Sequence, residues 1–194
     1  MRTFKAILLV SGIVAAIGCS KGSSEPQPAA SQGNEAPPIP ATGSVPMTKL
    51  TDGQIAEILS TVDSGEIEQA QVAQQRATRP EVRDFASHMI EQHTASKQAG
   101  AQLATQANLQ PASSPKAEEL QAASKKMLDN LSAADASNFD ITYVDGQIEQ
   151  HAAVLKLIQD QLAPAVNEPA LRDQLTNARG MVQQHLDQAR QLKK

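Results

Sequence analysis

The segment that decides the fold is ITYVDGQIEQHAAVLKLIQDQL, residues 141–162. Its large apolar residues recur at alternating steps of three and four, and one histidine takes a place in that series. The series is Ile141, Val144, Ile148, His151, Leu155, Ile158 and Leu162. This spacing is typical of a helix that packs nearly parallel or antiparallel to its neighbours. The segment therefore predicts one long helix of a helical bundle.

Three other segments repeat this spacing, and one titratable residue interrupts each of them. The first runs through Ile55, Leu59, Val62, Glu66 and then Ala70 or Ala73. The second runs through Val82, Ala86, Met89, His93, Ser96, Gly100 and Leu103. The last runs through Leu171, Leu175, Ala178, Val182, His185, Ala189 and Leu192. Helices with matching apolar stripes predict a four-helix bundle, and we expect no sheet because no segment alternates with period two.

Residues that start and stop helices agree with these stripes. The expected signals are capping pairs Thr51 with Gln54 and Thr78 with Glu81, Ser132 or Ser137 as the cap of the third long helix, Pro164 as its end, and Asn167 as the cap of the last helix. A loop at 110–115 leads into a shorter amphipathic helix at about 116–131. The expected fold class is all-α, a ferritin-like four-helix bundle with an additional short crossover helix.

The first nineteen residues have the pattern of a bacterial lipoprotein signal peptide. Two positive charges precede an apolar run from Ala6 to Ile17, and small residues then lead to Cys19, the only cysteine of the chain. We expect residues 1–18 to be removed and Cys19 to be lipidated, the alternative being an ordinary secretory signal cleaved nearby. Because Ser20 and not Asp follows, we expect an outer-membrane lipoprotein that faces the periplasm of a Gram-negative host.

The composition changes between residues 19–47 and residues 48–194. The first range is rich in proline and serine and predicts a disordered tether, whereas the second predicts one folded domain. Removal of Arg2 and Lys5, two positive charges, takes the formal net charge from −4 to −6. A mildly acidic chain without a basic cluster is not expected to bind nucleic acid. A protein partner or a homo-oligomer stays open.

The four interrupting residues point to a polar layer inside the bundle. A buried carboxylate or imidazole without a partner costs several kcal/mol, so such residues are kept only with partners. Glu66 and His93 both lie roughly 20 Å from the turn between their helices at about 1.5 Å per residue, so they share a layer. His151 and His185 differ in height by about 7 Å when measured from Pro164 and Asn167. His185 is therefore either a fourth member of this layer or part of a second one.

Three sequence motifs resemble a known bacterial family. They are Phe85-Ala86-x-x-Met89-x-x-x-His93, Phe139-Asp140-x-x-Tyr143-x-x-x-Gln147-x-x-x-His151 and His185-Leu186. These motifs are similar to those of the exported proteins called domain of unknown function 4142. The family usually has an acidic residue directly before the second-helix histidine, where this chain has Gln92. The resemblance covers about residues 50–192 and implies a ferritin-like bundle without an established activity.

The donor set does not suit a di-iron centre. A ferritin-like di-iron site needs Glu-x-x-His on two helices, but Ile90, Ile148 and Val182 stand three residues before the histidines. Three imidazoles and a carboxylate suit one divalent transition metal ion instead, such as zinc, iron, manganese or copper. The expected ligands are Glu66, His93 and His151, with His185 as a fourth ligand or a second-layer group. The other hypothesis is a hydrogen-bonded network without a metal.

Two functions follow from these observations. One is a non-enzymatic envelope lipoprotein, anchored in the membrane through Cys19, that binds a partner or has a stress-related role. The other is a mononuclear metal-binding protein for sequestration or redox chemistry. No serine, cysteine or lysine has a recognisable catalytic setting, and no glycine-rich phosphate loop occurs, so an enzyme is the less favoured class.

Overall fold

A computed structural model describes residues 49–194. The predicted signal peptide, Cys19 and the whole of the predicted tether lie outside the described residues. The helices are α1 (Asp52–Arg76), α2 (Pro80–Gln106), α3 (Pro115–Ala133), α4 (Phe139–Leu157), α5 (Ala163–Ala165) and α6 (Pro169–Leu192), with a π-helical turn η1 (Ile158–Leu162) between α4 and α5. Residues 49–194 contain no strand, which confirms the all-α prediction. No helix in this range is long and apolar enough to cross a membrane.

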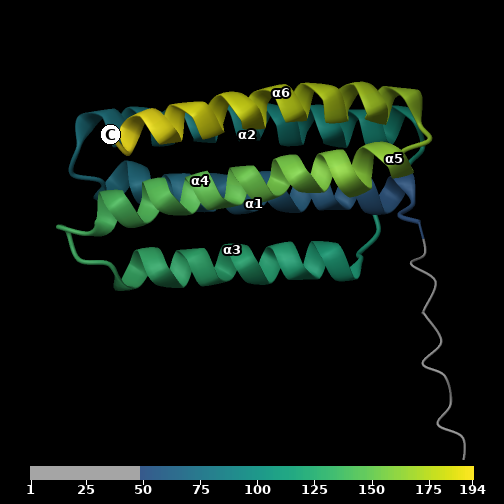
Figure 1. The fold of residues 1–194 in the computed structure, drawn as a ribbon. Coiled ribbons are helices and arrows are strands. Elements are labelled where there is room, and N and C mark those ends of the chain that lie inside the picture. Colours follow the sequence, from purple (N-terminus) through teal and green to yellow (C-terminus); the bar gives the residue numbers. More distant parts are fainter. Residues whose placement is uncertain (1–48) are drawn as a thin grey trace, which may run out of the picture. The chain divides into compact units, whose positions relative to one another are not determined.

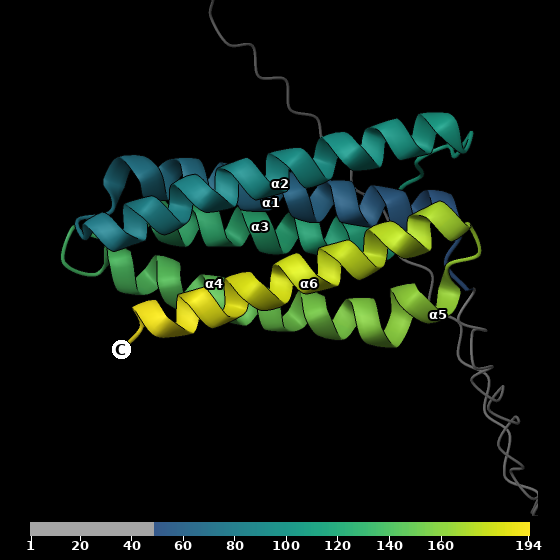
Figure 2. The same cartoon turned by 90° about the horizontal axis from the view of Figure 1, so that it is seen from above.

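The long helices form two antiparallel hairpins that pack side by side. Helix α1 packs on α2, α4 packs on α6, and α2 and α6 join the two hairpins (Figure 1). Helix α3 is the predicted crossover helix, and it lies outside the bundle against α1 and α4 (Figures 1 and 2). Because α1 and α4 touch each other only sparsely, α3 closes that side of the bundle.

Only one of the predicted helix caps forms as expected. Thr51 and Gln54 make the capping box of α1. Thr78 makes no such box, because Arg79 is the N-cap of α2 and the Thr78 hydroxyl instead donates to Asp140. The N-caps of α4 and α6 are Asn138 and Glu168, not Ser132, Ser137 or Asn167. The sequence signals predicted where each helix begins to within a few residues, but contacts between helices determine which residue is the N-cap.

Asp140 caps a helix other than its own. From the first turn of α4 its carboxylate accepts the backbone N–H groups of Thr78 and Arg79 at 2.9 Å, beside the start of α2. Burial raises the pKa of this carboxyl, but the hydrogen bonds from Thr78 and Arg79 outweigh burial, so the pKa lies below its ordinary value. Asp140 therefore holds the start of α4 against the turn between α1 and α2.

Pro164 does not end the third long helix at once. The chain continues through η1 and α5 to Ala165, and the N–H of Ala163 bonds the carbonyl of Ile158. A proline in an α-helix would clash with the carbonyl four residues earlier, and the wider π turn relieves that clash. The helix thus gains a short extension beyond the predicted end.

Two apolar clusters fill the bundle at its two ends. The aliphatic cluster lies toward α5 and consists of Ile55, Ile58, Leu59, Ala117, Val154, Leu157, Ile158, Leu162, Ala165, Val166, Leu171, Leu175, Ala178 and Val182. The aromatic cluster lies toward the other end and consists of Ala70, Ala73, Ala77, Val82, Phe85, Ala86, Met89, Met127, Leu131, Phe139, Tyr143, Val144 and Ala189. One predicted core residue is wrong, because Ile141 is 62% exposed while its neighbours Phe139 and Asp140 are buried. A polar layer separates the two clusters.

Candidate metal centre

Three histidines from three helices meet in this polar layer. His93 comes from α2, His151 from α4 and His185 from α6, and each is at most 2% exposed. One ring nitrogen from each lies within 4.8 Å of the others. The ring centroids are 5.1 to 5.9 Å apart. We call these residues the histidine triad.

Each ring of the triad has a hydrogen-bond acceptor at one of its two nitrogens, and this contact fixes the orientation of the ring. His93 Nδ1 is 2.8 Å from the carboxylate of Asp63 on α1. His151 Nδ1 is 2.9 Å from the backbone carbonyl of Gln147, and His185 Nε2 is 2.8 Å from the side-chain oxygen of Gln92. Each acceptor favours the proton on the ring nitrogen that it faces, which leaves the opposite nitrogen as a bare lone pair.

The opposite ring nitrogens are buried without a hydrogen-bond partner. They are Nε2 of His93, Nε2 of His151 and Nδ1 of His185, and none has a partner among the described residues. Unpaired buried polar atoms are rare in proteins and each costs about 1 to 3 kcal/mol. A triad in which every ring is held on one side and bare on the other has the arrangement of metal-binding histidines.

Glu66 lies beside the triad, outside the group of converging nitrogens. It comes from α1, is 3% exposed, and its Oε1 is 3.9 Å from His151 Nδ1. Its other oxygen, Oε2, has no hydrogen-bond partner among the described residues. The structure thus brings all four predicted residues into one layer, with three imidazoles in mutual reach and the carboxylate next to His151.

Burial keeps His151 and His185 neutral by lowering the pKa of each ring. Burial lowers the pKa of His185 to about 3, and neighbouring charge on His93, His151 and His88 would lower it further. Burial also lowers the pKa of His151, with Glu66 acting in the opposite direction. Neutral imidazoles are the form that binds metal ions, so no proton has to leave these two rings at neutral pH.

His185 belongs to the same layer as the other histidines. The sequence left open whether it lay in a second polar layer instead. The estimate of about 7 Å counted from Pro164 and Asn167. The helices actually end at Ala165 and begin at Pro169, so His151 and His185 lie fourteen and sixteen residues from the connection. A difference of two residues is roughly 3 Å along a helix.

Several buried residues around the triad were not among the predicted site residues. Asp63 lies off the predicted stripe of its helix, yet it is 4% exposed and contacts His93. Gln69 is fully buried and accepts from Gln147 at 3.0 Å and from Gln150 at 2.9 Å. Tyr143 is also fully buried, and its hydroxyl has no partner within residues 49–194. Burial and the charge of Glu66 raise the pKa of Tyr143 well above its ordinary value.

The residues present fit a metal ion. Three imidazoles that converge from separate helices can hold one ion, and a fourth position then remains for a small ligand. Three nitrogen donors without a thiolate suit zinc or copper(II) better than magnesium or calcium, which prefer oxygen. The buried lone pairs would gain partners on metal binding, which is the observation that favours an ion over a hydrogen-bonded network.

Comparison with known proteins supports this fold and gives the family. The family model described as "Domain of unknown function (DUF4142)" matches residues 37–192. No curated protein matches the chain. Among solved structures, "CopM in the Cu(II)-bound form" has a TM-score of 0.60 and 18% sequence identity, covering 75% of this chain and 97% of that chain. At this identity the likeness concerns the fold alone, a helical bundle.

Proposed function

This chain belongs to the family called domain of unknown function 4142, whose name assigns no activity, and we propose that it binds one divalent transition metal ion at the histidine triad. The observation that carries the proposal is the set of three buried ring nitrogens without partners. A hydrogen-bonded network would need a donor for each lone pair. Each acceptor instead favours the proton on the nitrogen that it faces, and no donor among the described residues reaches the opposite nitrogen.

Copper(II) is the ion that we expect to bind most tightly. Imidazole nitrogen is a good ligand for copper and zinc, and the general affinity order places copper(II) above zinc. The similar fold of a protein solved in its Cu(II)-bound form supports the same choice. The ion would provide a Lewis-acidic centre, and copper also a redox-active one, while Glu66 is a neighbouring carboxylate on the Nδ1 side of His151, outside the group of three imidazole donors.

We further propose that the protein works in the bacterial cell envelope as a lipoprotein without enzymatic activity. The support is the signal-like segment that ends at Cys19 and the proline-rich stretch that follows it. A tethered bundle with a buried copper or zinc site would sequester the ion at the membrane surface. Replacement of Cys19 by Ser should release the protein from the membrane fraction. If the wild type carries no lipid mass, the anchor is wrong and the metal site is unaffected.

Calorimetric titration tests the metal site. Metal-stripped protein should bind one copper(II) ion per chain, with zinc weaker and manganese weakest. Bound ion should raise the melting temperature, because it binds the folded state only. His151→Ala should abolish both effects. His88→Ala is the matched control, because His88 lies next to His185 on the bundle surface but outside the triad.

Two outcomes would overturn the proposal. One is that the wild type binds no ion at micromolar concentration. The other is that His151→Ala and His185→Ala bind copper as tightly as the wild type and His88→Ala do. Either result would leave the structural envelope lipoprotein as the better description of this chain.

A further inference from the structure

The side of the bundle that α3 covers contains a cavity. It lies between α1, α3 and α4 and has a volume of about 360 Å³. Glycines bring α3 close here, because a Cβ at Gly146 would lie 2.1 Å from Met127 Cε and a Cβ at Gly65 would lie 2.5 Å from Ser124 Oγ. Beside these contacts Ala123 and Ala153 leave room, and they are exposed at the cavity edge. Short side chains thus keep an opening under α3.

Glu66 stands at the inner end of this opening. It lines the cavity, although its side chain is only 4% exposed. Its Oε2 is a buried acceptor without a partner among the described residues, and its Oε1 lies 3.9 Å from His151 Nδ1, the ring nitrogen that faces the Gln147 carbonyl. An unpartnered buried carboxylate is costly, which indicates that it is kept for a cation.

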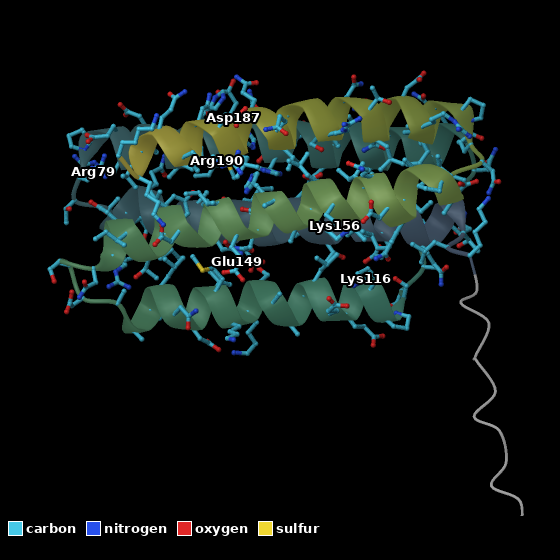
Figure 3. The ribbon with its side chains drawn as sticks, viewed as in Figure 1. Arg79, Lys116, Glu149, Lys156, Asp187 and Arg190 are labelled. Carbon is cyan, nitrogen blue, oxygen red and sulfur yellow. The ribbon has the colours of Figure 1, made fainter. Side chains whose placement is uncertain are left out.

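Carboxylates also stand on the outer wall of the cavity. Glu119 of α3 and Glu149 of α4 both line it and are exposed. Figure 3 shows Glu149 on the side of α4 that faces α3. Lys126 lines the same wall and Glu119 is paired with Lys116, so the outer wall is mixed in charge, and the carboxylate that would attract a cation is Glu66 at the inner end.

The other sides of the triad are closed by residues that already have partners or by an aromatic ring. Gln92 separates the triad from a groove between α2 and α6, and its side-chain oxygen is bonded to His185. The ring of Phe85 lies edge-on to His185, with ring centroids 6.4 Å apart. On a third side, Asp63 lines a cavity between α1 and α2, and its carboxylate is already bonded to His93. None of these three sides offers a buried carboxylate without a hydrogen-bond partner.

We propose that the cavity under α3 is the entrance through which a divalent cation reaches the histidine triad, and that Glu66 is the carboxylate that receives it before the imidazoles do. This inference rests on the proposed metal function and names the route to that site. Glu66 is a positioning residue for the incoming ion. The entrance therefore controls the rates of loading and release.

The test fills the cavity mouth and measures both rates. Tyr143, the only tyrosine in a chain without tryptophan, is a built-in fluorescent reporter for copper(II), which quenches nearby fluorophores. Stopped-flow mixing of full-length protein with copper(II) gives the loading rate, and excess chelator gives the release rate. The variant is Ala123→Phe with Ala153→Phe, and the single variant Ala153→Leu serves if the double variant folds poorly. The matched control is Ala99→Phe, an exposed alanine on the groove between α2 and α6.

We expect the double variant to slow loading and release by the same factor, about tenfold or more, with the equilibrium affinity unchanged. The control should keep wild-type rates. Glu66→Gln should slow loading while one ion still binds per chain.

Unchanged rates in the cavity variants, or equal slowing in Ala99→Phe, would show that the ion enters elsewhere. A wild type that binds no copper would overturn the proposed metal function instead. The two failures are therefore distinguishable.

Discussion

The aliphatic cluster and the histidine layer lie next to each other in one bundle. They differ in whether they contain buried polar atoms without hydrogen-bond partners. The aliphatic cluster contains only apolar side chains, and they pack against one another without any polar group to satisfy. The histidine layer contains three imidazoles and a carboxylate, each with one buried atom that has no partner within residues 49–194. The comparison indicates that the clusters at the two ends stabilise the fold, while the layer between them has unpaired atoms that a ligand can bind.

The largest effect on stability is expected in the aliphatic cluster. Leu171 is fully buried on α6, so Leu171→Ala should lower the free energy of unfolding by roughly 2 to 5 kcal/mol through lost burial and a new cavity. The loss should be the same in metal-stripped and copper-loaded protein, because Leu171 lies two turns or more from His185. Urea unfolding followed by circular dichroism measures it. A loss that disappears on metal loading would mean that the two regions are not separate.

The next effect concerns binding in the histidine layer. Asp63→Asn keeps the shape of the side chain but removes the charge that faces His93 Nδ1. Loss of such an outer carboxylate typically weakens metal binding about 10- to 100-fold. Competition with a chelator of known affinity measures the change, and Glu91→Gln is a control because Glu91 is an exposed carboxylate of α2 outside the proposed entrance. Equal affinities of Asp63→Asn and wild type would show that Asp63 only fills space.

A smaller effect is expected at Asp140, a buried carboxylate that already has its hydrogen-bond partners. Asp140→Ala removes the acceptor of the Thr78 and Arg79 N–H groups and should cost about 0.5 to 2 kcal/mol, as loss of a helix cap does. Metal affinity should not change. Because the pKa of this carboxyl is lowered in the folded state, its contribution is present above the unfolded pKa and is lost as pH falls through the folded pKa. Thermal melts at neutral and acidic pH should therefore differ less for the variant than for the wild type.

The smallest effect is expected outside both regions. Ile141→Thr should change the free energy of unfolding by no more than about 0.5 kcal/mol, because Ile141 is 62% exposed. The apolar spacing of the sequence predicts a core position there instead. A cost above about 2 kcal/mol, typical of a core truncation, would contradict the structure at the start of α4.

The sequence predicted the helices and the three histidines because both depend on spacing along one helix. The steps of three and four place His93, His151 and His185 on inward faces whatever the neighbouring helices are. The same counting failed at Ile141, because the start of α4 is turned so that Phe139 and Asp140 face inward. A stripe is least informative in the first turn of a helix, where capping contacts set the orientation.

The partners of the histidines could not be predicted in the same way. Asp63 and His93 are thirty residues apart, and their 2.8 Å contact depends on how far α1 is shifted along α2. The partner of Gln92 was equally unpredictable, because Gln92 precedes His93 in sequence but bonds to His185 on another helix. Spacing along a chain contains no information on such shifts between helices. The sequence therefore indicated Glu66, the carboxylate on the stripe, and overlooked Asp63 one turn earlier.

The distribution of the triad over the two hairpins has a consequence for how the protein folds. His93 belongs to the hairpin of α1 and α2, whereas His151 and His185 belong to the hairpin of α4 and α6. Each hairpin joins segments close in sequence and can form early, but the three imidazoles meet only after the hairpins have docked. The rate of copper binding during refolding would thus report the rate at which the hairpins dock. In a chain trapped before that step, at most two of the three histidines would be close to one another.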